Sequence, residues 1–135
     1  MRYFLIMTFL LFSSSKCRKN ENCPEGSHSK IIIKNNSTTF INWQGFFIDS
    51  IYRVNGQPRN NILKPSENDI YSYRTCWEEY FNTINNEYQY FLIFDNDTIQ
   101  AIGWQSISGT NRGLLKKIKV DLNYLKANDF TITYP

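Results

Sequence analysis

The chain has 135 residues, of which 41% are hydrophobic and 16% aromatic. This length and composition fit one domain with one hydrophobic core and leave too little chain for two. The formal net charge is +3, but Arg2 and Lys16 lie in an N-terminal segment that we expect to be removed. Without them Lys+Arg falls from 15 to 13 against 12 Asp+Glu, so the remainder is nearly neutral at +1. The charge therefore gives no reason to expect a nucleic-acid or acidic partner.

Residues 1–16 have the pattern of an export signal. A positive start is followed by an apolar run over residues 3–12, which has signal-peptide length and is too short to span a bilayer. Three serines then supply small residues before Cys17, and the segment resembles the signal of a bacterial lipoprotein. In such proteins the cysteine is lipidated and becomes the first residue, so the resemblance implies an anchor at Cys17. Lys16 departs from the small residue usual at that place, and a plain secretory signal cut near the serines is the alternative.

The chain has three cysteines, Cys17, Cys23 and Cys76. A lipid on Cys17 leaves an even pair, and an exported, oxidising location permits a Cys23–Cys76 disulfide. Such a cross-link contributes about 3–4 kcal/mol in the chain-entropy model, because it closes a long loop in the unfolded chain. It would also fix the end of residues 17–29, a polar segment that we predict to be a tether. Two free thiols are the alternative.

We predict a single globular domain over residues 30–135, with strands where apolar or aromatic residues run or alternate between turn signals. In chain order we expect strands at 30–34, 40–52, 61–63 and 70–74, a helix within 76–84, a strand at 88–95, a helix within 98–107, a strand at 114–120, a helix within 121–129 and a strand at 130–134. Gly45 is expected to mark a bulge, and Asp121 to cap the last helix. The strand at 88–95 is apolar on both faces, so we expect it to be central.

The links between these strands have hairpin or short-helix length, and no regular βαβ alternation appears. Antiparallel pairing is therefore favoured. The predicted fold class is mainly β, or α+β: a small antiparallel β-sandwich-like domain with two or three short helices.

Six parts of the sequence, taken in order, are spread over most of the mature chain: residues 31–37 (IIIKNNS), 76–81 (CWEEYF), 92–99 (LIFDNDTI), Trp104, 115–125 (LKKIKVDLNYL) and 130–135 (FTITYP). Together they resemble the small lipoproteins of unknown function found in Bacteroidetes, most distinctively at the ending. The resemblance implies an anchored envelope domain. It brings no established activity and no catalytic residues.

An apolar strand followed by Asp95-Asn96-Asp97-Thr98 resembles the first motif of haloacid-dehalogenase-like phosphatases. There the first aspartate is the nucleophile and the second a general acid/base. That fold also needs a doubly wound parallel sheet, and too little chain follows to supply it. A calcium loop starting at Asp95 lacks the required glycine and glutamate. We predict instead that Asp95 and Asn96 end the strand and that Asp97 caps the next helix with Gln100 in a capping box.

Two short patterns concern hydroxyl groups. Residues 49–51 (DSI) and 97–99 (DTI) resemble the O-glycosylation acceptor of exported Bacteroidetes proteins, so Ser50 and Thr98 are candidate sugar acceptors. Two N-glycosylation sequons are also present and would matter only in a eukaryote.

Other reactive groups are scarce. His28 is the only histidine and falls in the predicted tether. Glu78 and Glu79 are adjacent on a predicted helix and therefore point apart. Cys76 is better explained as a disulfide partner than as a nucleophile. We predict no catalytic residue, no metal site and no cofactor.

Most aromatic side chains on the strands are expected in the core. Strand alternation puts Tyr71 and Tyr73 on one face. If that face points outward, these two residues and Trp43 would form a platform for a glycan or a peptide.

The function favoured by the sequence is that of a cell-envelope lipoprotein with a non-enzymatic structural or interaction domain, partnered by the membrane through its lipid and by an envelope protein or glycan. The alternatives are a small glycan- or peptide-binding module that uses exposed aromatics, and a phosphatase-like hydrolase that uses Asp95 and Asp97. The expected location is the bacterial envelope, at the outer membrane. In the group that this chain resembles, an acidic cluster after the lipidated cysteine is similar to a surface-export signal. Residues 18–22 (RKNEN) lack such a cluster, which favours a domain on the periplasmic side.

Overall fold

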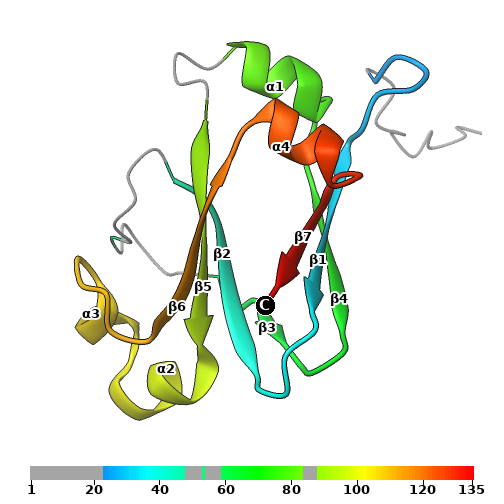
Figure 1. Cartoon of the computed structure of the whole chain (residues 1–135). Coiled ribbons are helices and arrows are strands. Elements are labelled where there is room, and N and C mark those ends of the chain that lie inside the picture. Colours follow the sequence, from blue (N-terminus) through cyan, green and yellow to red (C-terminus); the bar gives the residue numbers. More distant parts are fainter. Residues whose placement is uncertain (1–22, 48–52, 54–58, 84–87) are drawn as a thin grey trace, which may run out of the picture.

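Figure 1 shows the computed structural model of the chain, which describes residues 23–47, 53, 59–83 and 88–135. Over these residues the chain forms two facing sheets with short helices at both ends. In chain order the elements are β1 (Lys30–Asn35), β2 (Ile41–Phe47), β3 (Ile62–Leu63), β4 (Asn68–Ser72), α1 (Trp77–Thr83), β5 (Gln89–Asp95), α2 (Asn96–Ile102), α3 (Trp104–Ile107), β6 (Leu114–Val120), α4 (Leu122–Ala127) and β7 (Thr131–Tyr134). The prediction of a mainly β, sandwich-like domain is confirmed.

One sheet has the order β4-β1-β7 and the other the order β3-β2-β5-β6; we call them the three-stranded and the four-stranded sheet. All neighbouring strands are antiparallel except β1 and β7, which run parallel with Ile32 opposite Thr131. The strand β7 follows β6 and α4 in the chain but joins the other sheet. Because α4 carries the chain over the end of the sandwich, the last strand can lie beside the first in a parallel pair.

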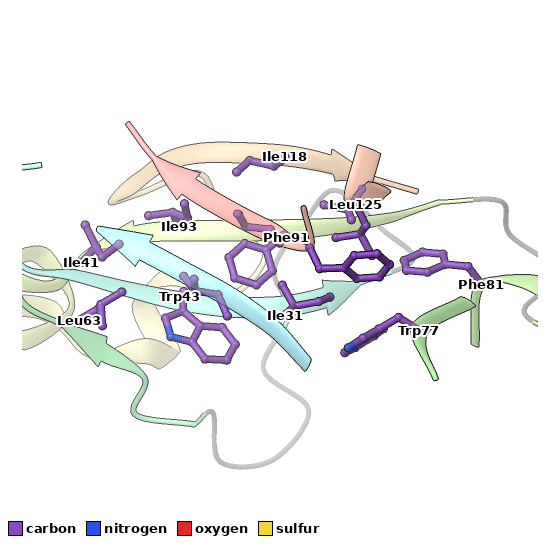
Figure 2. Close-up of a cluster of buried hydrophobic side chains, with 14 residues drawn as sticks. Ile31, Ile41, Trp43, Leu63, Trp77, Phe81, Phe91, Ile93, Ile118 and Leu125 are labelled. Carbon is purple, nitrogen blue, oxygen red and sulfur yellow. The ribbon is translucent and has the colours of Figure 1, made fainter. Parts of the chain in front are cut away.

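The space between the sheets is filled by a cluster of buried side chains (Figure 2). Ile31 of β1 and Phe91 of β5 are fully buried there and come from opposite sheets. The helices close the cluster at one end, where α1 contributes Trp77 and Phe81 and α4 contributes Leu125. Burial of each such side chain contributes about 1.5–3 kcal/mol, so this cluster is the main source of stability.

Strand β5 lies between β2 and β6 and is buried on both faces, as predicted for the central strand. On the face turned away from the other sheet, Leu92 and Phe94 form a second cluster with Ile99 of α2 and Ile107 of α3. The Trp104 ring of α3 meets the Phe94 ring edge-on, with centroids 5.5 Å apart. An antiparallel sheet often has one face in solvent. Because α2 and α3 cover this face of β5, the strand is apolar on both faces.

The sequence predicted one helical segment at 98–107, but the structure has two helices there. The described residues therefore contain four helices in place of the predicted two or three. The break falls at Gly103, whose φ of 74° lies in the left-handed region that glycine adopts readily. The Gly103 N–H donates to the Ile99 carbonyl at 2.8 Å and closes α2.

Gly45 marks the predicted bulge in β2. The register between β2 and β5 shifts between Gln44 and Phe47. A Cβ on Gly45 would lie 3.1 Å from the Phe91 ring, so glycine allows the strand to approach that ring. The rest of this predicted strand, residues 48–52, lies outside the described residues.

Candidate functional site

The segment before β1 is fastened to one end of the sandwich by five residues, which we call the N-terminal clasp: Cys23, His28, Cys76, Glu78 and Phe130. Cys23 and Cys76 form a disulfide with their Cα atoms 5.2 Å apart, so the predicted pairing is confirmed and the alternative of two free thiols is wrong. Cys76 is buried directly before α1. The bond therefore joins the start of the described chain to a helix that packs in the core.

His28 forms the second part of the N-terminal clasp. Its ring Nδ1 lies 2.8 Å from Oε1 of Glu78, and its backbone N–H donates to Oε2 at 3.1 Å. The ring also stacks on Phe130, with centroids 3.7 Å apart and planes 14° apart. The backbone adds a hydrogen bond from the Trp77 N–H to the His28 carbonyl at 2.8 Å. Residues 23–29, predicted as the last part of a tether, thus pack against α1 and the turn before β7.

The two glutamates of α1 have different surroundings. Burial of the Glu78 carboxyl raises its pKa, but hydrogen bonds from the His28 ring and backbone outweigh this, so the pKa lies below its ordinary value of 4.5. Glu79 is exposed, so the two carboxyls do not converge. The clasp brings together a histidine, a carboxylate and two cysteines, but the two sulfurs are bonded to each other. Neither Cys23 nor Cys76 is therefore available as a thiolate nucleophile, and the contacts of the clasp hold residues 23–29 against the domain.

The cap of α2 is not the residue that the sequence indicated. Asp95 is the N-cap, and its Oδ2 accepts hydrogen bonds from the Thr98 N–H at 2.9 Å and the Thr98 hydroxyl at 2.6 Å. The predicted cap, Asp97, lies inside the first turn and is exposed, as is its predicted partner Gln100. The prediction was wrong because α2 begins at Asn96, directly after the strand, which shifts every capping position towards the N-terminus.

Thr98, a predicted sugar acceptor, is half-buried between Asp95 and the turn before β6. A Cβ on Gly113 would lie 2.9 Å from Cγ2 of Thr98, so the two residues are in close contact. Glycosylation of Thr98 stays a prediction. Ser50, the other predicted acceptor, and Cys17, the predicted lipid site, lie outside the described residues.

The phosphatase alternative depends on a fold that the described residues do not form. In place of a doubly wound parallel sheet, these residues form two sheets in which only β1 and β7 run parallel. Nor does the described part of the chain bring three or more His, Cys, Asp or Glu side chains together where they would hold a metal ion. No described helix is long and apolar enough to cross a membrane.

The aromatic residues singled out for binding point inward. Trp43 is 3% exposed; its ring stacks on Phe91, and its indole N–H donates to Asp69 Oδ2 of β4 at 3.1 Å. Tyr71 and Tyr73 share one face as predicted, but that face packs against the core, and burial raises the pKa of the Tyr71 phenol. The outward face that a stacking platform requires is therefore occupied by other residues.

Asn35 is a structurally important residue that the sequence reasoning missed. Its side chain is fully buried, and its Nδ2 donates to the Thr39 carbonyl at 2.8 Å and to the Leu63 carbonyl at 3.0 Å. Its Oδ1 accepts from the backbone N–H and the hydroxyl of Ser37. One carboxamide thus joins the end of β1 to β3 in the other sheet. The polar residues at 35–39 predict a turn after β1. They give no indication that the Asn35 side chain reaches the other sheet.

Neither a protein-family model nor a curated protein nor a solved structure matches this chain. The likeness to Bacteroidetes lipoproteins therefore stays a prediction from the residues that carry it.

Proposed function

We propose that this chain is a bacterial cell-envelope lipoprotein, anchored through a lipid on Cys17, whose folded part is a non-enzymatic structural or interaction domain. The observation that carries the proposal is the Cys23–Cys76 disulfide. Structural disulfides form in oxidising compartments outside the cytosol, which agrees with an export signal over residues 1–16. Only residues 18–22 separate the proposed lipid from the clasp, which suits a domain held at a membrane.

The surroundings of the carboxylates support a non-enzymatic role. Asp95 caps α2 and Asp121 caps α4, where its Oδ1 accepts from the Tyr124 N–H at 2.6 Å. Glu78 holds His28. Each of these groups has a structural task that uses its charged oxygens. Inward-facing aromatics and two mainly antiparallel sheets give no support to the binding-module and phosphatase alternatives.

Metabolic labelling with palmitate in a bacterium that processes lipoproteins tests the anchor. Wild-type protein is expected to take up label and to partition with the membrane fraction, and Cys17→Ala is expected to lose both properties. Cys23→Ala is the matched control, because it removes a cysteine from the same region and should keep the label. Unlabelled wild type would overturn the proposal. Protease added to intact cells then tests the periplasmic side, where the domain is expected to be protected.

A further inference from the structure

The two sheets differ in what covers their outer faces. Helices α2 and α3 cover part of the four-stranded sheet through the cluster around Leu92 and Phe94 (Figure 1). None of the described helices covers the outer face of the three-stranded sheet. Ile70 and Ile32, which are cross-strand partners at the centre of that face, are 55% and 37% exposed. An adjacent pair of isoleucines is thus left in solvent, whereas their strand neighbours Ile31 and Ile33 are fully buried.

The residues around this isoleucine pair are basic or uncharged. Alternation along β1 places Lys30 and Lys34 on either side of Ile32, and the parallel register brings Thr131 and Thr133 beside them. The remaining outward positions of β4 are Asn68 and Ser72. The one carboxylate of β4, Asp69, points inward to Trp43. Neither lysine forms a salt bridge with any residue that the structure describes.

The N-terminal segment joins the domain through β1, the central strand of the three-stranded sheet. In Figure 1 the described chain that leads into β1 lies at the α1–α4 end of the sandwich, at the upper right. The disulfide and His28 hold this segment in place. An extended chain spans at most about 3.5 Å per residue, so Cys17 lies within about 20 Å of Cys23. A lipid on Cys17 would therefore keep the clasp and the start of β1, which carries Lys30, close to the bilayer.

We propose that the outer face of the three-stranded sheet, which we call the Ile32–Ile70 face, rests on the anionic surface of the membrane that holds the anchor. This inference rests on the proposed lipid at Cys17. The two isoleucines contact the acyl boundary, and the two lysines place their ammonium groups among lipid phosphates. A second copy of this chain is a poorer occupant, because two-fold pairing of the face would bring lysines of both copies together.

The test uses the full, lipidated protein reconstituted in vesicles. Ile70→Cys is labelled with the environment-sensitive fluorophore NBD, since the other cysteines carry lipid or form the disulfide. Ser106→Cys on α3 is the matched control, because it is exposed on the covered sheet's side. In vesicles containing phosphatidylglycerol, emission from position 70 is expected to shift to the blue and to be quenched by spin-labelled lipid, whereas emission from position 106 stays unchanged. The shift should weaken in pure phosphatidylcholine and in 1 M salt, where the Debye length is about 3 Å.

A second variant separates electrostatic contact from the mere closeness of the anchor. Lys30→Glu with Lys34→Glu, carrying the same label at position 70, should lose the blue shift while it still floats with the vesicles. Equal signals from positions 70 and 106, or an unshifted label at 70, would overturn the inference and leave a protein partner as the occupant. Self-quenching at position 70 in detergent would overturn it in favour of a second copy. Protein that fails to float or to take up palmitate would overturn the proposed anchor, and this inference with it.

Discussion

The two ends of the sandwich are held by contacts of different kinds. At the clasp end, the disulfide joins residues 53 positions apart, and His28 reaches Glu78 across 50 positions. At the other end, Asp95 caps α2 through a residue three positions away, and the Asn35 amide reaches the Leu63 carbonyl across 28 positions. The comparison teaches that one end has a covalent link, whereas the other depends on hydrogen bonds and turn chemistry. Changes at the two ends should therefore differ in size and in their response to reducing agents.

The disulfide should give the largest effect. Cys76→Ala is expected to lower the free energy of unfolding by about 4 kcal/mol, because the unfolded chain regains the freedom of a long loop. Urea unfolding followed by tryptophan fluorescence measures the change. Cys23→Ala should lose a similar amount, and a reducing agent should destabilise wild type but neither variant. Equal stability of wild type and variants would show that the clasp end is held by its other contacts.

At the α2–α3 end, the close contact between Gly113 and Thr98 should be nearly as sensitive. Gly113→Ala is expected to cost about 3 kcal/mol, because its Cβ meets Thr98 and its φ of 68° is unfavourable for alanine. The control is Gly109→Ala, which has a φ of 72° and nothing within 4 Å of the added Cβ. It should cost about 1 kcal/mol. Thermal or urea unfolding measures the stability of both variants. Adding Thr98→Ser to Gly113→Ala should restore part of the lost stability, and this recovery measures the contribution of the steric clash.

The helix cap should have a smaller effect. Asp95→Ala is expected to lower the free energy of unfolding by about 1 kcal/mol, the usual cost of losing an N-cap side chain. Asp97→Ala changes an exposed residue and should stay within about 0.5 kcal/mol of wild type. Urea titration distinguishes the two. A larger loss at Asp97 than at Asp95 would contradict the cap that the structure shows.

The contact between Glu78 and His28 in the clasp should have the smallest effect on stability, and this effect should depend on pH. The pKa of Glu78 is lower in the folded chain, so its contribution is fully present above the ordinary value of 4.5 and is lost as pH falls through the folded value. Glu78→Gln is expected to cost less than about 1 kcal/mol at pH 7, as for a partly exposed pair. The deficit of Glu78→Gln should shrink as the pH is lowered below 4.5. Melting curves across this range, with the exposed Glu79→Gln as control, measure the effect.

The sequence predicted the strands well because their signal is local. Alternation located the strands, two-sided apolarity identified β5 as central, and the Asp121 cap was found in place. The cap of α2 was misplaced by two residues, because Asp95 both ends the strand and starts the helix. The residues at this boundary were identified correctly, but their pattern did not show at which residue the strand ends and the helix begins.

Features that depend on the whole fold were harder to predict. Alternation put Tyr71 and Tyr73 on one face but could not say which side faces the other sheet. His28 sits in a polar segment with no local sign that Glu78 and Phe130 lie beside it. The cross-link made by Asn35 likewise depends on where β3 lies. The disulfide was predictable although it closes a long loop, because the number of cysteines and the expected oxidising location together indicated it.

The parallel pairing of β1 and β7 has a consequence for when the domain can fold. Strand β1 is the first to be synthesised, yet one of its two neighbours is formed by residues 131–134. Until those residues have emerged, Ile31 and Ile33 belong to a two-stranded ribbon, which is marginally stable alone. Completion of the three-stranded sheet is therefore a late step with high contact order. A chain released before residue 131 should therefore leave one edge of β1 unpaired and open to pairing with another strand.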